Sequence, residues 1–275
     1  MKNDSQRSST IIKLIIFSLL AIGGGWLGRF IDQMMGLDPS EGLGVLIWLL
    51  SPIILSFILR VLYKEGWGDL GIKPDLIRNW RWYLISLLIY PFNIVVILLI
   101  GSAMGWISLH DLTPGTFIPV VIAGLIGSIL TASEELGWRG YLAPKVHRLK
   151  LPSLLEHVIV GLIWGAWHIP YFSVFWGYAM KNLPCFTILF FLGAITHSIV
   201  YGEIRILSKS VWPALMMHAA GNAIFNPLIG EGFISFTPGK ELLATVGIEG
   251  AVGIVIMLLL GIWIHNWRIN HQPQA

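Results

Sequence analysis

Residues 83–106 read YLISLLIYPFNIVVILLIGSAMGW, an apolar stretch without a charged side chain. About 20 apolar residues are enough for an α-helix to cross the hydrocarbon core of a bilayer. Similar runs recur on both sides of this stretch. We predict eight transmembrane spans in all, the other seven at residues 10–26, 43–58, 117–132, 157–176, 186–201, 211–228 and 243–264.

The composition agrees with a membrane protein. Of the 275 residues, 55% are hydrophobic and 12% are charged, whereas soluble domains carry about 25% charged residues. Lipid offers no hydrogen bonds to a bare backbone, so the spans must be helices. We therefore predict an all-α polytopic bundle of about eight transmembrane helices, without strands, in which residues 1–275 form a single integral membrane domain.

Basic residues cluster in alternate connections between the spans. They lie at residues 60–81, 139–150 and 205–209 and at Arg268, while the other connections carry few. Basic loops stay on the cytoplasmic side, so we expect both termini to be cytoplasmic. The membrane that we expect is a bacterial plasma membrane. The formal net charge of +3 forms no basic stripe. This distribution favours contact with lipid headgroups and argues against nucleic acid binding.

The first polar motif needing an explanation is Ser133-Glu134-Glu135-Leu136-Gly137-Trp138-Arg139, at the end of the fourth span. Glu135 and Arg139 are four residues apart, so one helical face can pair them. Glu134 then has no local counter-charge. Two adjacent carboxylates at a low-dielectric boundary are suited to acid–base chemistry, and the alternative is a solvated helix end with an exposed ion pair.

Two further spans carry imidazoles at similar depth. His168 follows Trp164-Gly165-Ala166-Trp167, and His218 precedes Asn222 by one helical repeat, so these two share a face. Polar groups inside a membrane usually face a cavity or a partner. His218 and Asn222 could donate hydrogen bonds to an oxyanion. The alternatives are helix packing for His168 and hydrogen bonding between helices for the pair.

These motifs resemble the CPBP family of intramembrane proteases, which contains the type II CAAX prenyl endopeptidases and bacterial Abi-type proteins. The family pattern Glu-Glu-x-x-x-Arg corresponds to Glu134-Glu135-Leu136-Gly137-Trp138-Arg139, aromatic-x-x-x-His to Trp164 through His168, and His-x-x-x-Asn to His218 through Asn222. Trp164 departs from the usual Phe. The resemblance covers about residues 120–226 and implies an eight-helix bundle with a catalytic cavity open to the cytoplasmic side.

The resemblance also implies roles for individual residues. Glu134 would activate a water, His168 would hold that water, and His218 and Asn222 would stabilise the oxyanion, with Glu135, Arg139 and Trp164 in support. The competing mechanism places zinc on Glu134, His168 and His218, because two imidazoles and a carboxylate form a known catalytic zinc set. We favour no cofactor, since no His-Glu-x-x-His helix is present.

The sequence therefore predicts an intramembrane endopeptidase that hydrolyses a peptide bond in a membrane-associated peptide or protein. Two other functions explain the same residues in part. A non-catalytic membrane scaffold or bacteriocin-immunity-type protein would use the bundle as a partner surface. A small transporter would use the buried Glu and His side chains as a proton relay, but the sequence shows no internal repeat of the kind transporters have.

Overall fold

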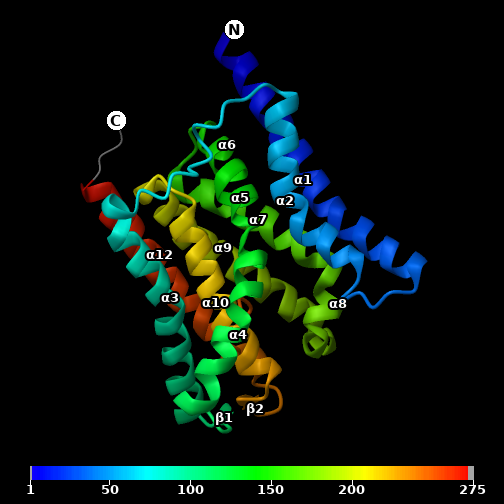
Figure 1. The fold of residues 1–275 in the computed structure, drawn as a ribbon. Coiled ribbons are helices and arrows are strands. Elements are labelled where there is room, and N and C mark those ends of the chain that lie inside the picture. The colour runs from blue at the N-terminus through cyan, green and yellow to red at the C-terminus, as the bar shows by residue number, and fades with distance from the viewer. Residues whose placement is uncertain (1, 272–275) are drawn as a thin grey trace.

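The computed structural model describes residues 2–271, so residues 1 and 272–275 of the predicted single domain lie outside the described residues. The described chain is mostly helical (Figure 1). The long helices are α1 (Lys2–Met35), α2 (Leu43–Leu62), α3 (Leu76–Ala103), α4 (Pro114–Ala132), α7 (Ser153–His168), α9 (Leu183–Ser208), α10 (Trp212–Gly230) and α12 (Ala251–His271). Short helices connect them: α5 (Glu135–Gly137), α6 (Ala143–His147), α8 (Phe172–Phe175) and α11 (Glu241–Ala244).

Seven helical segments of the described chain are long and apolar enough to cross a membrane: Gln6–Met35, Leu43–Leu62, Leu76–Ala103, Pro114–His147, Ser153–Phe175, Met180–Ser208 and Ala251–His271. The predicted fold class, an all-α polytopic membrane bundle, is confirmed. The remaining predicted span corresponds to α10, a 19-residue helix that is not among the seven. His218, Asn222 and Asn226 lower its mean hydropathy, so the polar residues of the candidate site account for its exclusion.

One pair of short strands contradicts the expectation that there would be none. The strands β1 (Ile107–Leu109) and β2 (Ile234–Phe236) are antiparallel, with Ser108 opposite Ser235. They lie at the end of the bundle opposite the chain termini (Figure 1). The rule that only helices span lipid concerns segments exposed to hydrocarbon, and these strands belong to connections between helices. Their pairing joins the turn after α3 to the turn after α10.

The last span begins later than predicted. Residues 243–264 were expected to be continuous, but α12 begins at Ala251 and residues 245–250 form a non-helical segment that is buried except at Ile248. A close contact with α9 fixes this segment, because a Cβ atom on Gly193 would lie 1.8 Å from the carbonyl oxygen of Ile248. Irregular backbone is tolerated in a membrane bundle where protein buries it or where it lines a cavity.

The start of α1 and the end of α12 lie at the same end of the bundle, the end that also holds α6 (Figure 1). The connections α2–α3, α6–α7 and α9–α10 lie there too, and these are the connections in which the sequence places the basic residues. The structure thus gathers the predicted cytoplasmic loops at one end.

Beyond α5 the fourth span continues through one π-helical turn, Trp138–Leu142, into α6. The π turn is fully buried, and neighbouring elements approach it closely. A Cβ atom on Gly137 would lie 2.4 Å from Cβ of Pro52, and one on Gly140 would lie 2.6 Å from a methyl group of Leu70. Single π turns in α-helices are frequent at functional sites, and this one follows directly after the two adjacent glutamates.

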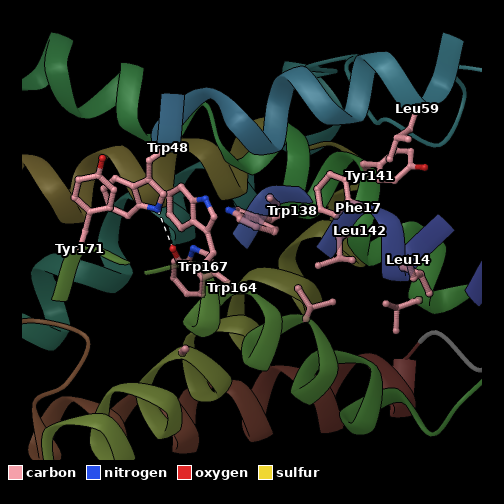
Figure 2. Close-up of a cluster of buried hydrophobic side chains, with 14 residues drawn as sticks. Leu14, Phe17, Trp48, Leu59, Trp138, Tyr141, Leu142, Trp164, Trp167 and Tyr171 are labelled. Atoms are coloured by element: carbon pink, nitrogen blue, oxygen red, sulfur yellow. Dashed lines mark hydrogen bonds between the residues drawn. The ribbon is translucent and has the colours of Figure 1, made fainter. Parts of the chain in front are cut away.

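A row of aromatic rings forms the core on the side of α1, α2 and α7 (Figure 2). Trp48 stacks on Trp167 and Tyr171 at centroid distances of 4.4 and 4.3 Å, and its indole N–H donates to the carbonyl of Trp167 at 2.9 Å. Trp167 in turn meets Trp138 edge-on at 5.5 Å. Such pairs contribute about 0.5–1.5 kcal/mol each beyond burial, so the row fixes the position of Trp138.

Candidate active site

A cavity of about 390 Å³ contains five of the seven predicted site residues: Glu134, Trp164, His168, His218 and Asn222. Its walls are formed by the start of α2, by α3, by the junction of α4 and α5, by α7 and α10, and by residues 246–249. Glu135 and Arg139 lie behind the wall, where both are fully buried. The fold therefore brings together side chains that the sequence places on three separate spans.

The cavity extends away from the chain termini. Along α10 its lining runs from His218 to Gly230 at the helix end, and it also includes Phe175, Trp176 and Glu249. These segments belong to the β1–β2 end of the bundle (Figure 1). The resemblance implies an opening on the cytoplasmic side, and that opening stays a prediction.

Glu134 is held by two contacts that leave it facing the cavity. The indole N–H of Trp138 donates to its Oε2 at 2.9 Å, and its Oε1 lies 3.3 Å from Nε2 of His218. Trp138 is itself fixed by the aromatic row. The counter-group that the local sequence lacks is thus supplied by α10, and the carboxylate has one oxygen anchored and one oriented toward an imidazole.

Glu135 and Arg139 pair as their spacing predicts, at 3.1 Å. The guanidinium also lies over two rings, with Cζ 4.5 Å from the ring centroid of Tyr201 and 5.0 Å from that of Trp164. Glu135 Oε1 is 2.9 Å from Nδ1 of His218. An unbroken series of contacts therefore runs from Arg139 through Glu135 and His218 to Glu134.

His168 has one ring nitrogen occupied and one free. Its Nδ1 is 2.8 Å from the carbonyl oxygen of Trp164, which can only accept, so this nitrogen carries the proton. In the neutral ring Nε2 is then an acceptor. The ring is enclosed by aromatic side chains, with Trp167 at 4.7 Å and Phe190 at 5.2 Å between centroids. His168 can accept a hydrogen bond from a water in the cavity.

His218 and Asn222 share a face of α10 and line the cavity, as predicted. The amide of Asn222 donates to Oγ1 of Thr131 on α4 at 3.0 Å. Between them, Gly221 lets Tyr90 of α3 cross the helix, because a Cβ atom there would lie 2.9 Å from the tyrosine ring. The small residue in this motif is thus needed for packing next to the site.

The arrangement gives no support to the zinc alternative. In the described part of the chain, no three His, Cys, Asp or Glu side chains are grouped as metal ligands. Nδ1 of His168 is bonded to a carbonyl, and both nitrogens of His218 contact carboxylates. A metal on Glu134, His168 and His218 would have to replace the contact between His218 and Glu134, so these three side chains as arranged do not fit a metal.

Sequence reasoning missed a second carboxylate in the cavity, Glu249. It is fully buried and accepts a hydrogen bond from Tyr178. A signal was present in the sequence, because residue 249 lay within the predicted span 243–264. The rule that singles out ionisable residues inside spans applies to Glu249 as much as to Glu134.

The geometry is consistent with a family match. The family model described as "Type II CAAX prenyl endopeptidase Rce1-like" matches residues 114–224. Residues 114–224 are a CAAX prenyl endopeptidase domain of this family. The domain begins at the first residue of α4, ends within α10 and includes all seven predicted site residues. Membership implies an intramembrane protease that acts on a protein substrate. No curated protein matches the chain.

The CAAX endopeptidase domain does not build the cavity alone. Tyr90 precedes the matched residues, as does Trp48, and Glu249 follows them. Helices outside the domain thus complete the walls around the catalytic candidates.

Proposed function

We propose that this protein is an endopeptidase that hydrolyses a peptide bond of a membrane-associated peptide or protein, with a glutamate-activated water. The observation that carries the proposal is the series of contacts from Arg139 through Glu135 and His218 to Glu134 at the wall of a cavity lined by aromatic rings. Buried charges of this kind are expensive unless they pair, and this series ends at a cavity rather than in the core.

Glu134 acts as the general base. Its Oε1 takes a proton from a water that also donates to Nε2 of His168, and the resulting hydroxide attacks the peptide carbonyl. The hydrogen bond from Trp138 to Oε2 leaves Oε1 as the basic oxygen. When the tetrahedral intermediate collapses, Glu134 returns the proton to the departing amine, which completes the hydrolysis.

His218 and Asn222 stabilise the oxyanion. In the resting site Nε2 of His218 is turned to Glu134. Once Glu134 has accepted the proton of the water it is neutral, and the N–H of His218 is released to the new oxyanion as that charge develops. Asn222 supplies a second donor from the same face of α10. One such donor is worth about 3 kcal/mol in other hydrolases.

Glu135 and Arg139 position His218. The carboxylate of Glu135 contacts Nδ1 and thereby fixes the ring orientation, as the carboxylate of a serine-protease triad does for its histidine. Arg139 balances the charge of Glu135 in a buried setting. Neither residue lines the cavity, so both act through His218.

The test is cleavage of a pooled library of membrane peptides by the purified protein in detergent. Wild type is compared with Glu134→Gln and with Glu231→Gln, a matched control because Glu231 is exposed and lies outside the cavity. We expect cleavage by wild type and by the control, with or without a chelator, and none by Glu134→Gln. Chelator-sensitive cleavage that zinc restores would support the metal mechanism instead.

Absence of any Glu134-dependent cleavage would favour the scaffold function. A scaffold should keep its cellular effect in the Glu134→Gln variant, whereas an enzyme should lose it. The transporter alternative would give proton-coupled flux in liposomes.

We also propose that both termini face the cytoplasm of a bacterial plasma membrane. The basic connections, the start of α1 and the end of α12 gather at one end of the bundle, which supports this orientation. Reporter fusions to the two termini, one active only in the cytoplasm and one only outside it, test the proposal. A reporter signal from outside would overturn it.

A further inference from the structure

Glu249 lies at the part of the cavity formed by the segment before α12. Its side chain is fully buried and lines the same cavity as Glu134. Tyr178 donates to Oε1, and Oγ1 of Thr245 lies 3.4 Å from that oxygen. Oε2 is buried and has no hydrogen-bond partner. Most buried polar atoms are paired, so an unpaired carboxylate oxygen in the wall of a cavity indicates a missing ligand.

The backbone holds Glu249 in place. Residues 244–247, 249 and 250 are buried, and the amide of Gly247 donates to Oγ1 of Thr245 at 3.3 Å. Gly193 on α9 allows the carbonyl of Ile248 to approach. A side chain fixed in this way loses little conformational freedom on binding, which favours affinity for a group that fits it.

The cavity lacks a positive counterpart for this carboxylate. Its lining contains two acidic side chains, Glu134 and Glu249, and neither Lys nor Arg. Glu134 already faces His218, whereas the hydrogen bonds to Glu249 come from the hydroxyl groups of Tyr178 and Thr245 and bring no positive charge. Trp176 and Phe175 line the cavity as well, and aromatic faces attract cations. Charge and ring placement both favour a cationic ligand.

We propose that Glu249 is a specificity residue that binds a basic side chain, Lys or Arg, of the peptide cleaved at Glu134. The cation donates to the free Oε2, while Tyr178 keeps Oε1 occupied and the aromatic rings cover the aliphatic part of the side chain. This inference rests on the proposed function, because it assumes that a peptide occupies the cavity. The fixed position of Glu249 then sets the separation between the basic residue and the bond that is cleaved.

The first test measures peptide binding and needs no cleavage. Glu134→Gln protein in detergent is titrated with a fluorescent peptide carrying Lys and with the same peptide carrying norleucine, which keeps the length and removes the charge. We expect at least tenfold tighter binding of the Lys peptide when the residue stands at the matching position. Equal affinities at every position would overturn the proposal, even if Glu249 variants proved unstable.

The second test assigns the preference to Glu249. The ratio of kcat/KM for the Lys peptide to that for the norleucine peptide is measured in wild type, Glu249→Gln and Glu231→Gln. Gln keeps the shape and removes the charge, so the ratio should fall at least tenfold in Glu249→Gln and stay unchanged in Glu231→Gln. An unchanged ratio in Glu249→Gln would overturn the role of Glu249. Absence of Glu134-dependent cleavage by the wild-type protein would instead overturn the proposed function. The binding test would still show whether the cavity prefers a basic side chain.

Discussion

Two buried clusters in this protein are built from the same residue types and differ in how completely they are paired. In one, Glu203 on α9 accepts from His157 at 3.0 Å, from His265 at 2.7 Å and from Arg268 through both oxygens. In the other, Glu134 and Glu135 share His218, and Arg139 has two guanidinium nitrogens without hydrogen-bond partners. Residue type alone does not separate them.

Pairing and access separate the two clusters. Glu203 is fully buried and both of its oxygens are occupied, so it joins α7, α9 and α12. The second cluster ends at the cavity, where the contact between Glu134 and His218 can break during the reaction. Complete pairing of a buried charge serves the fold, because an unpaired charge is costly. Incomplete pairing beside a cavity leaves groups available for chemistry, and each prediction below tests this distinction.

The largest effect is expected for Glu134→Gln. Loss of a general base costs about 10²–10⁴-fold in rate. The amide oxygen of Gln can still accept from Trp138, so the melting temperature should change little. Cleavage kinetics and thermal melting in detergent, measured on the same preparation, check both parts. A large drop in melting temperature would mean that this cluster is also structural.

The opposite result is expected for Glu203→Ala. Removing one partner from a buried charge network typically costs about 3–5 kcal/mol, because Arg268 and two histidines lose their acceptor. Thermal melting should show the loss, while kcat/KM per folded molecule stays near the wild-type value. Loss of activity in protein that remains folded would contradict the distinction between the clusters.

Asn222→Ala should reduce kcat/KM by about 10²-fold, the effect of losing one oxyanion donor. The hydrogen bond to Thr131 is lost as well, so Thr131→Val serves as the control for that contact. We expect the threonine variant to retain most of its activity. Equal losses in both variants would mean that Asn222 acts by joining α4 to α10.

The smallest effect concerns a partly exposed cluster at the termini end of the bundle. Asp69 contacts Arg60 at 2.6 Å and Arg148 at 2.8 Å. Burial alone would raise the pKa of Asp69, but the hydrogen bond from Arg60 and the charges of Lys145 and Arg148 outweigh it and lower the pKa. A lowered folded-state pKa gives stability above the unfolded value of about 3.9, and this stability is lost as the pH falls through the folded value.

Arg60 is buried and Asp69 is partly exposed, and the side-chain oxygen of Asn can still accept a hydrogen bond from Arg60, so the expected loss of stability is about 1 kcal/mol. Asp69→Asn should therefore lower the melting temperature slightly at neutral pH and make it less sensitive to acidification below about pH 4. Melting curves across this range in wild type and variant check the prediction. Identical pH profiles would show that Asp69 does not contribute through its charge.

Local spacing predicted part of the site. The four-residue separations gave the pairing of Glu135 with Arg139 and the shared face of His218 and Asn222, because helix geometry alone determines them. The contact between Glu134 and His218 depends on how the α4–α5 junction meets α10, which no local pattern encodes. Tyr90 and Trp48 also line the cavity, and packing between helices distant in the sequence places them there.

The fold was predictable where hydropathy decides it and less so elsewhere. Apolar runs located the spans, but the predicted start of the last span failed because Gly193 and residues 245–250 make a tertiary contact that stops the helix. His265 was assigned to the region beyond the last span, yet it is buried on α12 beside Glu203. Charged partners inside the bundle extended that helix further than its hydrophobicity suggested.

The π turn at Trp138–Leu142 also determines the rotational phase of the chain around the site. A π turn holds one residue more than an α turn, and one residue corresponds to about 100° of rotation in an α-helix. Glu134 and Glu135 precede this turn and α6 follows it. The extra residue therefore sets the orientation of the two glutamates relative to α6. Deleting one residue between positions 138 and 142 would turn the glutamates relative to α6 and separate Glu134 from His218, although every catalytic side chain would still be present.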